Sequence, residues 1–167
     1  MSKSYQNAIN LSDTEEEIRK KVAQMFTEAG IRTQAVENIE QVIWTKALYN
    51  CALNPLGAFL GMTYGELAEG TQTKEYMDNI LKEAYQVLRK KKIKLPWKSA
   101  QDYLLHFYKN LIPPTAAHYP SMLHDLQKKK RTEIDALNGA VVDYGNAVGF
   151  CLPFSEVLVH LVKFKEC

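Results

Sequence analysis

Four polar side chains in two separated blocks of the sequence have the chemistry to hold and protonate a small polar molecule. Lys46, Asn50 and Asn54 follow one another at four-residue intervals, so they share one face if their segment is helical. Glu133 lies in a second block, Arg131 to Gly139, where it would stand near the start of a helix. One ammonium, two amides and one carboxylate can orient an oxygen-rich substrate and donate a proton to it. We take these residues as candidates for a functional site.

Each candidate also has a purely structural interpretation. Lys46 on an otherwise apolar helix is compatible with a surface lysine whose stem covers its neighbours. Glu133 is compatible with a first-turn acid that the helix dipole favours, and Asn50 and Asn54 with buried amides whose hydrogen bonds are satisfied within the fold. The residue types alone leave both interpretations open.

Apolar residues at helical spacing place the candidates on helices. Asn38 can cap a long helix that runs toward Leu53, and Pro55, which lacks an N–H, is expected to kink or end it. Thr132 can cap the helix that carries Glu133. Pro153 suits the first turn of a last helix. The two blocks therefore belong to two different helices.

Other boundary signals continue the helical pattern. Residues 12 to 15, Ser-Asp-Thr-Glu, offer a capping box, and Gly30 a helix end. Ser99 with Asp102 offers another capping box. The glycines at 57, 61 and 65 predict close packing or a turn. With no confident strand, the sequence predicts an all-α fold, a compact bundle of about seven helices forming a single domain over residues 1–167.

The composition narrows the function classes. Hydrophobic residues make up 46% of the 167 and charged residues 24%, and the net charge of +2 gives no general attraction to nucleic acid or to an anionic membrane. No apolar run is long enough to span a bilayer, and the first residues do not look like a secretory signal. The cysteines and histidines lack metal-ligand spacing. Three scattered cysteines favour a reducing, cytoplasmic location.

Three ordered blocks carry a family resemblance that covers most of the chain. They are Trp44-x-Lys46-x-x-x-Asn50-Cys51-x-x-Asn54-Pro55-Leu56, Tyr119-x-Ser121-Met122-Leu123-x-Asp125 and Arg131-Thr132-Glu133-Ile134-Asp135-x-x-Asn138-Gly139. Together they resemble the C-terminal domain of the ketopantoate reductase (2-dehydropantoate 2-reductase) family. That resemblance implies a helical domain of the 6-phosphogluconate dehydrogenase C-terminal-like type.

The resemblance also implies an activity and residue roles. The reaction of that family is the NADPH-dependent reduction of 2-dehydropantoate to pantoate, a step toward coenzyme A. Lys46 matches the family's catalytic lysine, and Glu133 matches an acid that hydrogen-bonds the substrate hydroxyl. Asn50, Asn54 and Ser121 match substrate-orienting positions, although Ser121 is equally compatible with a helix cap.

Two positions depart from the family pattern. His118 and Tyr64 stand where asparagines are expected, so substrate contacts are expected to differ from those for ketopantoate.

The family's nucleotide-binding half is not recognisable in the sequence. No Gly-x-Gly-x-x-Gly turn is present to seat a pyrophosphate. We therefore expect NADP(H) to serve the full-length family but not to bind this chain alone, which would be inactive without its nucleotide-binding partner. The sequence does not distinguish an expressed fragment from a short natural protein.

The expected partners are a small 2-oxo acid, the nucleotide-binding domain and a second copy in a homodimer. The alternative function is a standalone helical module for dimerisation or interaction, without catalysis.

Overall fold

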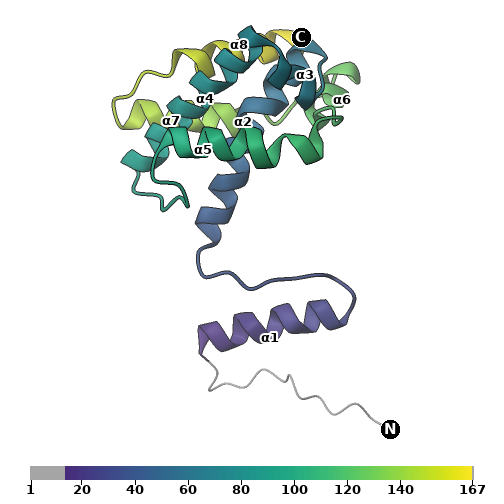
Figure 1. Cartoon of the computed structure of the whole chain (residues 1–167), viewed down its shortest axis with the longest axis vertical. Helices are drawn as coiled ribbons and strands as arrows, with labels where there is room; N and C mark the ends of the chain where they lie inside the picture. The colour runs from purple at the N-terminus through teal and green to yellow at the C-terminus, as the bar shows by residue number, and fades with distance from the viewer. Residues whose placement is uncertain (1–13, 167) are drawn as a thin grey trace. The chain divides into compact units, whose positions relative to one another are not determined.

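The computed structural model describes residues 14 to 166, which form helices joined by turns and extended links (Figure 1). The chain divides into two compact units, residues 1 to 39 and 40 to 167, which are described separately. The α-helices are α1 (Glu15–Glu28), α2 (Ile39–Leu60), α3 (Tyr64–Glu69), α4 (Thr71–Lys90), α5 (Ala100–His106), α6 (Ser121–Gln127), α7 (Ala140–Ala147) and α8 (Pro153–Glu166). Short π and 3₁₀ turns are η1 (Phe107–Leu111), η2 (Pro113–Thr115) and η3 (Asp135–Gly139). The described residues contain no strand, which confirms the all-α prediction.

The first unit contains α1. Thr14 caps this helix and forms a capping box with Glu17, since each side chain bonds the other residue's backbone N–H. The predicted box began at Ser12, which lies outside the described residues. The helix ends at Glu28, and Gly30 follows with a φ of +88°, a left-handed conformation that favours glycine, as predicted.

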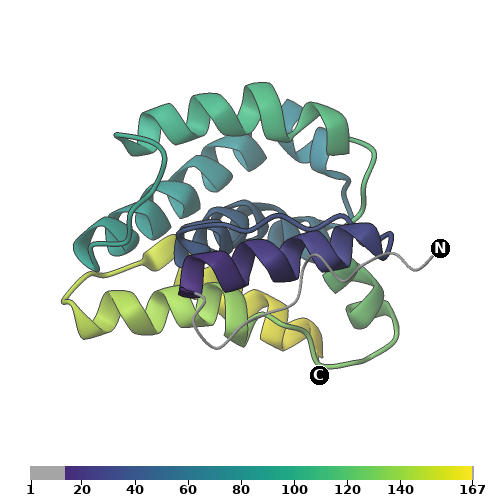
Figure 2. The same cartoon turned by 90° about the horizontal axis from the view of Figure 1, so that it is seen from below.

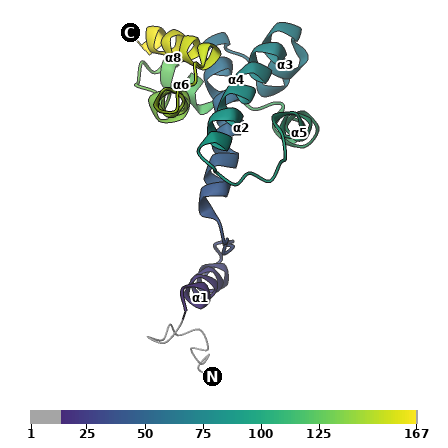
Figure 3. The ribbon, with the colours of Figure 1, turned by 90° about the vertical axis from the view of Figure 1, so that its left-hand side faces the viewer.

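The second unit is layered around α2. Figure 3 shows α2 and α4 in the middle, with α5 on one side and α6 and α8 on the other. Figure 2 shows α5 alongside α4, an arrangement in which Tyr108 of η1 donates a hydrogen bond of 2.6 Å to Asp78 of α4. Ser99 and Asp102 form the predicted capping box of α5, and Pro153 is the first residue of α8.

The hydrophobic core of this unit is centred on the C-terminal half of α2. Residues 51 to 58 of that helix are all buried. Around them lie the largest fully buried side chains of the neighbouring helices, which include Met77 and Ile80 of α4, Tyr103 of α5 and Phe107 of η1. Burial of such aromatic and aliphatic groups supplies most of the driving force for folding. The helix that carries Lys46, Asn50 and Asn54 is therefore held rigidly at its C-terminal end.

Pro55 was predicted to kink or to end its helix. It lies inside α2, which continues to Leu60, so Pro55 does not end the helix. Proline cannot donate to the carbonyl four residues earlier, which belongs to Cys51. Asn138 supplies the missing donor, because its side-chain amide bonds the Cys51 carbonyl at 3.0 Å. A side chain from η3 therefore replaces the hydrogen-bond donor that the backbone of α2 lacks at Pro55.

Close backbone packing explains two of the glycines. A Cβ on Gly57 would stand 3.0 Å from the Met62 carbonyl oxygen, and one on Gly65 would stand 3.0 Å from the Ala116 carbonyl oxygen. Gly61 takes a left-handed φ of +71° directly after α2. The predicted close packing and turn are confirmed. Among the helices described, none is long and apolar enough to cross a membrane.

Candidate functional site

A hydrogen bond joins the two sequence blocks that carry the candidate residues. The Asn54 amide donates to the Glu133 carboxylate at 3.2 Å, across 79 residues of sequence. Asn54 is only 5% exposed, whereas Glu133 is exposed. A buried amide therefore holds one carboxylate oxygen while the remainder of Glu133 faces solvent, as a ligand-binding acid must.

Tyr64, at the start of α3, completes the hydrogen bonding of Asn54. Its hydroxyl donates to the Asn54 side-chain oxygen at 2.8 Å. Burial, with the nearby Tyr49 and the Glu133 charge, raises the pKa of Tyr64 to about 12, so the phenol stays protonated at neutral pH. The amide is fixed from both ends, and its orientation toward Glu133 is determined.

His118, the other residue that departs from the family pattern, lies beside Tyr64. The Tyr64 backbone N–H donates to the His118 carbonyl at 3.1 Å, and the two rings are 6.5 Å apart. Tyr49 packs edge-on against Tyr64 at 5.9 Å. An aromatic cluster therefore borders Asn54.

The block that contains Glu133 is held in place by several contacts. The Thr132 backbone N–H donates to Glu166 at 2.6 Å, and the Thr132 hydroxyl accepts from the Ile134 N–H at 3.2 Å. The prediction that Thr132 caps a helix carrying Glu133 is wrong, since η3 begins only at Asp135 and Ile134 occupies its capping position without a side-chain hydrogen bond. Asp135 pairs with Arg131 at 3.0 Å and with Lys163 at 2.6 Å, and these cations lower the pKa of the Asp135 carboxyl.

The helix that carries Lys46 was predicted to pack against the helix that carries Glu133. Glu133 lies just before η3, and α2 packs against the segment that follows it. Besides the Asn54 and Asn138 hydrogen bonds, the rings of Trp44 on α2 and Tyr144 on α7 lie 5.6 Å apart. The contacts run along α2 from residue 44 to residue 54. This packing sets the relative position of the two blocks.

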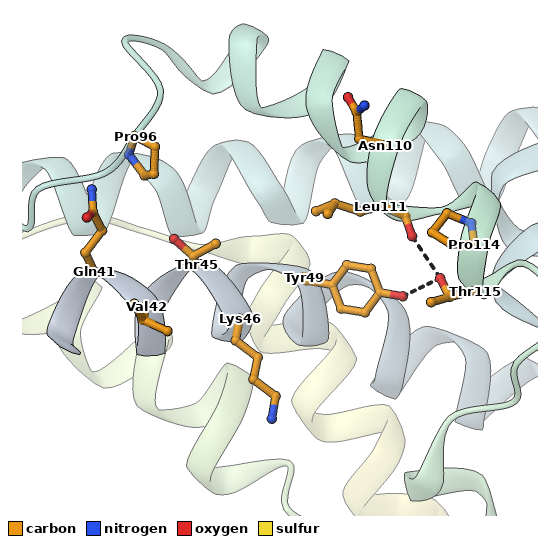
Figure 4. A pocket seen from close by; sticks show the side chains of 10 residues that line it. All are labelled: Gln41, Val42, Thr45, Lys46, Tyr49, Pro96, Asn110, Leu111, Pro114 and Thr115. Carbon is orange, nitrogen blue, oxygen red and sulfur yellow. Dashed lines mark hydrogen bonds between the residues drawn. The ribbon is translucent and has the colours of Figure 1, made fainter. Parts of the chain in front are cut away.

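The remaining candidates occupy different surroundings. Lys46 is exposed and Asn50 is partly buried. Figure 4 shows the Lys46 ammonium pointing away from Asn110 and Pro96. Ser121 is exposed and is the first residue of α6, where Pro120 occupies the capping position, so the helix-cap interpretation of Ser121 is wrong. The convergence of Lys46, Asn50 and Glu133 on one bound molecule stays a prediction.

A cavity of about 580 Å³ opens beside Lys46, between the N-terminal half of α2 and the η1–η2 segment (Figure 4). Its surface is almost entirely apolar. The Tyr49 hydroxyl and the Thr115 hydroxyl, 2.7 Å apart, close one end. The lining residues are Gln41, Val42, Thr45, Lys46, Tyr49, Pro96, Asn110, Leu111, Pro114 and Thr115. A volume in this range is typical of small-molecule sites.

Sequence reasoning missed three contributors to this region. Tyr64 was noted only as a departure from the family pattern, and Asn138 only as part of a motif, while Tyr49 was given no role. Pro55 itself was the available signal, since a proline within a helical pattern leaves a carbonyl that requires a donor from elsewhere. The sequence does not show that Asn138 is that donor. No group of three or more His, Cys, Asp or Glu side chains that could hold a metal ion occurs among residues 14 to 166.

Comparisons with a family model and with curated proteins identify the same family. The sequence family described as "Ketopantoate reductase PanE/ApbA C terminal" matches residues 38–166. A 2-dehydropantoate 2-reductase of Aquifex aeolicus is 49% identical over 152 residues, which are 91% of this chain and 49% of that protein. Another, of Lactococcus lactis, is 33% identical over 94% of this chain and 50% of its own length. The chain thus spans about half the length of the curated relatives it matches.

Solved structures share the fold. A PanE/ApbA family ketopantoate reductase from Ralstonia eutropha is 31% identical with a TM-score of 0.79, over 88% of this chain and 48% of that one. A ternary complex of D-mandelate dehydrogenase with NADH and anilino(oxo)acetate is 33% identical with a TM-score of 0.81, over 94% of this chain and 64% of that one. The structural similarity therefore extends to a ketopantoate reductase and to a D-mandelate dehydrogenase.

Proposed function

The chain belongs to the ketopantoate reductase C-terminal domain family, and on that premise we propose that it is the substrate-binding domain of an NADPH-dependent 2-oxo acid reductase. When joined to a nucleotide-binding domain, it would reduce 2-dehydropantoate to pantoate in the cytoplasm. The observation that carries the proposal is the Asn54–Glu133 hydrogen bond, since it unites the two motif blocks in one polar site. The 2-dehydropantoate 2-reductases among the relatives support the choice of substrate.

The described residues do not fit the nucleotide cofactor. Residues 14 to 166 contain no strand and no strand–glycine turn–helix unit, which is the arrangement that seats a dinucleotide pyrophosphate. The hydride donor is therefore assigned to a second domain, and the roles below concern only this chain's side chains.

We assign to Lys46 the role of proton donor. Reduction of a ketone leaves negative charge on its oxygen, and a nearby ammonium stabilises that charge and supplies the proton that makes the alcohol. Lys46 is exposed on α2, so its ammonium can reach a substrate that lies over this helix. Glu133 accepts a hydrogen bond from the substrate hydroxyl. Asn50, Asn54 and Ser121 orient the substrate, Asn54 by positioning Glu133.

The test joins this chain to the nucleotide-binding domain of the Aquifex aeolicus relative and follows NADPH oxidation with 2-dehydropantoate. Lys46→Ala should lower kcat by about a hundredfold or more, the usual contribution of a general acid. Lys82→Ala, which removes an exposed lysine of α4, is the control and should leave kcat unchanged. A fusion that turns over while Lys46→Ala keeps more than about a tenth of its activity would exclude Lys46 as the proton donor.

A non-catalytic interaction module remains the second candidate, and exposed apolar side chains favour it. Phe154, Val157 and Phe164 of α8 are 36%, 49% and 77% exposed. Surfaces of this kind often bind another protein. Reduction of 2-dehydropantoate by the fusion would support the reductase function over the interaction module.

A further inference from the structure

The cavity beside Lys46 is larger than the family's own substrate requires. Its volume is about 580 Å³. 2-Dehydropantoate has about ten non-hydrogen atoms, which fill at most roughly 300 Å³ at the share of about 30 Å³ that liquid water gives each molecule. The space therefore accommodates a bulkier group than the substituent of that acid.

The walls of the cavity suit an apolar group. Val42, Leu111 and Pro114 present aliphatic carbon, and Tyr49 presents an aromatic ring. Each methylene or ring carbon that leaves water for such a surface contributes favourably to binding. A carboxylate or a ketone would gain little there, so the polar end of a substrate must lie elsewhere.

A chain of contacts links the cavity to the polar site. Tyr49 forms the cavity wall and packs against Tyr64, Tyr64 bonds Asn54, and Asn54 bonds Glu133. Lys46 stands at the boundary, because it is one of the lining residues while its ammonium points away from Asn110 and Pro96 (Figure 4). Lys46 is exposed and its stem is flexible, so another rotamer would let the ammonium approach a ligand at the cavity mouth. One ligand can therefore place its acid near Lys46 and its substituent in the cavity.

Thr45 is the one wall residue with a buried polar side-chain atom that is unpaired. Among the described residues, its hydroxyl oxygen is buried and has no hydrogen-bond partner. A rotamer change would exchange the hydroxyl and the methyl group. Thr45 therefore provides a direct test of whether the cavity selects an apolar or a polar group.

We propose that this cavity receives the substituent of the substrate, and that the domain selects 2-oxo acids with a bulky apolar substituent, aromatic or branched. The inference rests on the proposed function for the identity of the acid group. It goes beyond that function in assigning the substituent pocket and the substrate class.

The experiment measures binding to this chain alone by NMR titration, which needs neither cofactor nor turnover. Phenylglyoxylate and pyruvate are the two probes, since they share the 2-oxo acid group and differ in the substituent. We expect phenylglyoxylate to bind at least about tenfold more tightly, from the apolar area that its ring buries. Equal affinity for the two acids would overturn the proposal.

Two variants on the same helix locate the binding. Val42→Trp fills the cavity and should abolish the preference for phenylglyoxylate, whereas Ile43→Trp is the matched control. Val42 and Ile43 are 46% and 57% exposed, so both changes are compatible with folding, and only Val42 lines the cavity. An equal loss in both variants would refute the assignment of the cavity.

Thr45→Val removes the hydroxyl and keeps the shape of the side chain. Phenylglyoxylate binding should be unchanged or tighter, because an apolar substituent makes no use of a hydroxyl. A loss of more than about threefold would mean that the cavity selects a polar group, which is against the proposal.

The outcome is separable from that of the proposed function. Binding that is sensitive to Val42→Trp, in a chain whose fusion shows no reductase activity, would support the pocket and reject the reductase. An active fusion, together with equal binding of the two probes to the chain, would support the reductase function and reject the substituent pocket.

Discussion

At the scale of single residues, the surroundings of Asn54 contain two protonated groups that burial holds in their neutral form. Burial, assisted by the Glu133 charge, raises the pKa of the Cys51 thiol from 9.0 to about 12. Burial raises the pKa of Tyr64 from 10.0 to about 12. Both side chains lie in the core, so their ionisation would place a charge where water cannot solvate it. Cys51 is therefore an inert core thiol and not a nucleophile.

These shifts predict a loss of stability in alkali. A raised pKa means that the folded state binds a proton that the unfolded state has released. Each group therefore stabilises the fold fully below its unfolded pKa and loses that contribution as the pH rises to about 12. The unfolding free energy in urea should fall between pH 9 and pH 12, by up to about 1.4 kcal/mol per pH unit for each group.

Cys51→Ala is the control for this prediction. It should reduce the dependence on pH above pH 9, whereas Cys151→Ala, at an exposed thiol, should leave it unchanged. The same slope in wild type and Cys51→Ala would mean that Cys51 does not contribute.

At the scale of elements, α2 and η3 depend on each other through one hydrogen bond. Pro55 leaves the Cys51 carbonyl without its helical donor, and Asn138 donates to it at 3.0 Å. Asn138 and Cys51 are each 1% exposed, so bulk water does not reach the groups that this bond joins. This bond lies close to the Asn54–Glu133 pair, and it holds the two helical segments that carry the pair.

A double-mutant cycle tests this dependence. Asn138→Ala should destabilise the domain by roughly 1–3 kcal/mol, because it leaves a buried carbonyl unpaired. Pro55→Ala restores an N–H at position 55 that can bond the Cys51 carbonyl within the helix. In that background Asn138→Ala should cost about 1 kcal/mol less. Urea unfolding of the four proteins measures the coupling, and additive costs would contradict it.

At the scale of the whole molecule, the hydrophobic core and the candidate site belong to the second unit. The buried cluster runs from Leu48 to Val162, and the family match covers residues 38–166. Apolar side chains nevertheless remain exposed on this unit, with Val42 and Ile43 on α2 and Val157 and Phe164 on α8. Such surface favours association with a partner.

We predict that the isolated chain associates with itself, most simply as a symmetric dimer. Light scattering over a concentration series should show a mass that rises above 19.1 kDa. Val157→Glu with Phe164→Glu should reduce the association by placing like charges on the exposed face of α8. Leu105→Glu, on the exposed face of α5, is the control. A mass that stays constant at high concentration would mean that the chain is monomeric.

The sequence by itself determined the helical class, most of the helix boundaries and the residues of the site motifs. Capping boxes, apolar spacing and terminal glycines act within a few residues, so the chain displays them directly. Asp102 after Ser99 and Gly30 after α1 are examples that the structure confirms. The family also follows from local blocks, because each keeps its residue types at fixed spacing.

The tertiary structure alone decided how these parts meet. Asn54 contacts Glu133 across 79 residues, Tyr64 fixes Asn54, and Asn138 lets α2 continue through Pro55. The rule that proline ends a helix considers only the backbone donor that is lost, and a side chain from elsewhere can replace it. Such pairings depend on which groups become buried together, since an unpaired polar group is costly only where water is excluded. That condition arises when the helices pack, and no local pattern of residues encodes it.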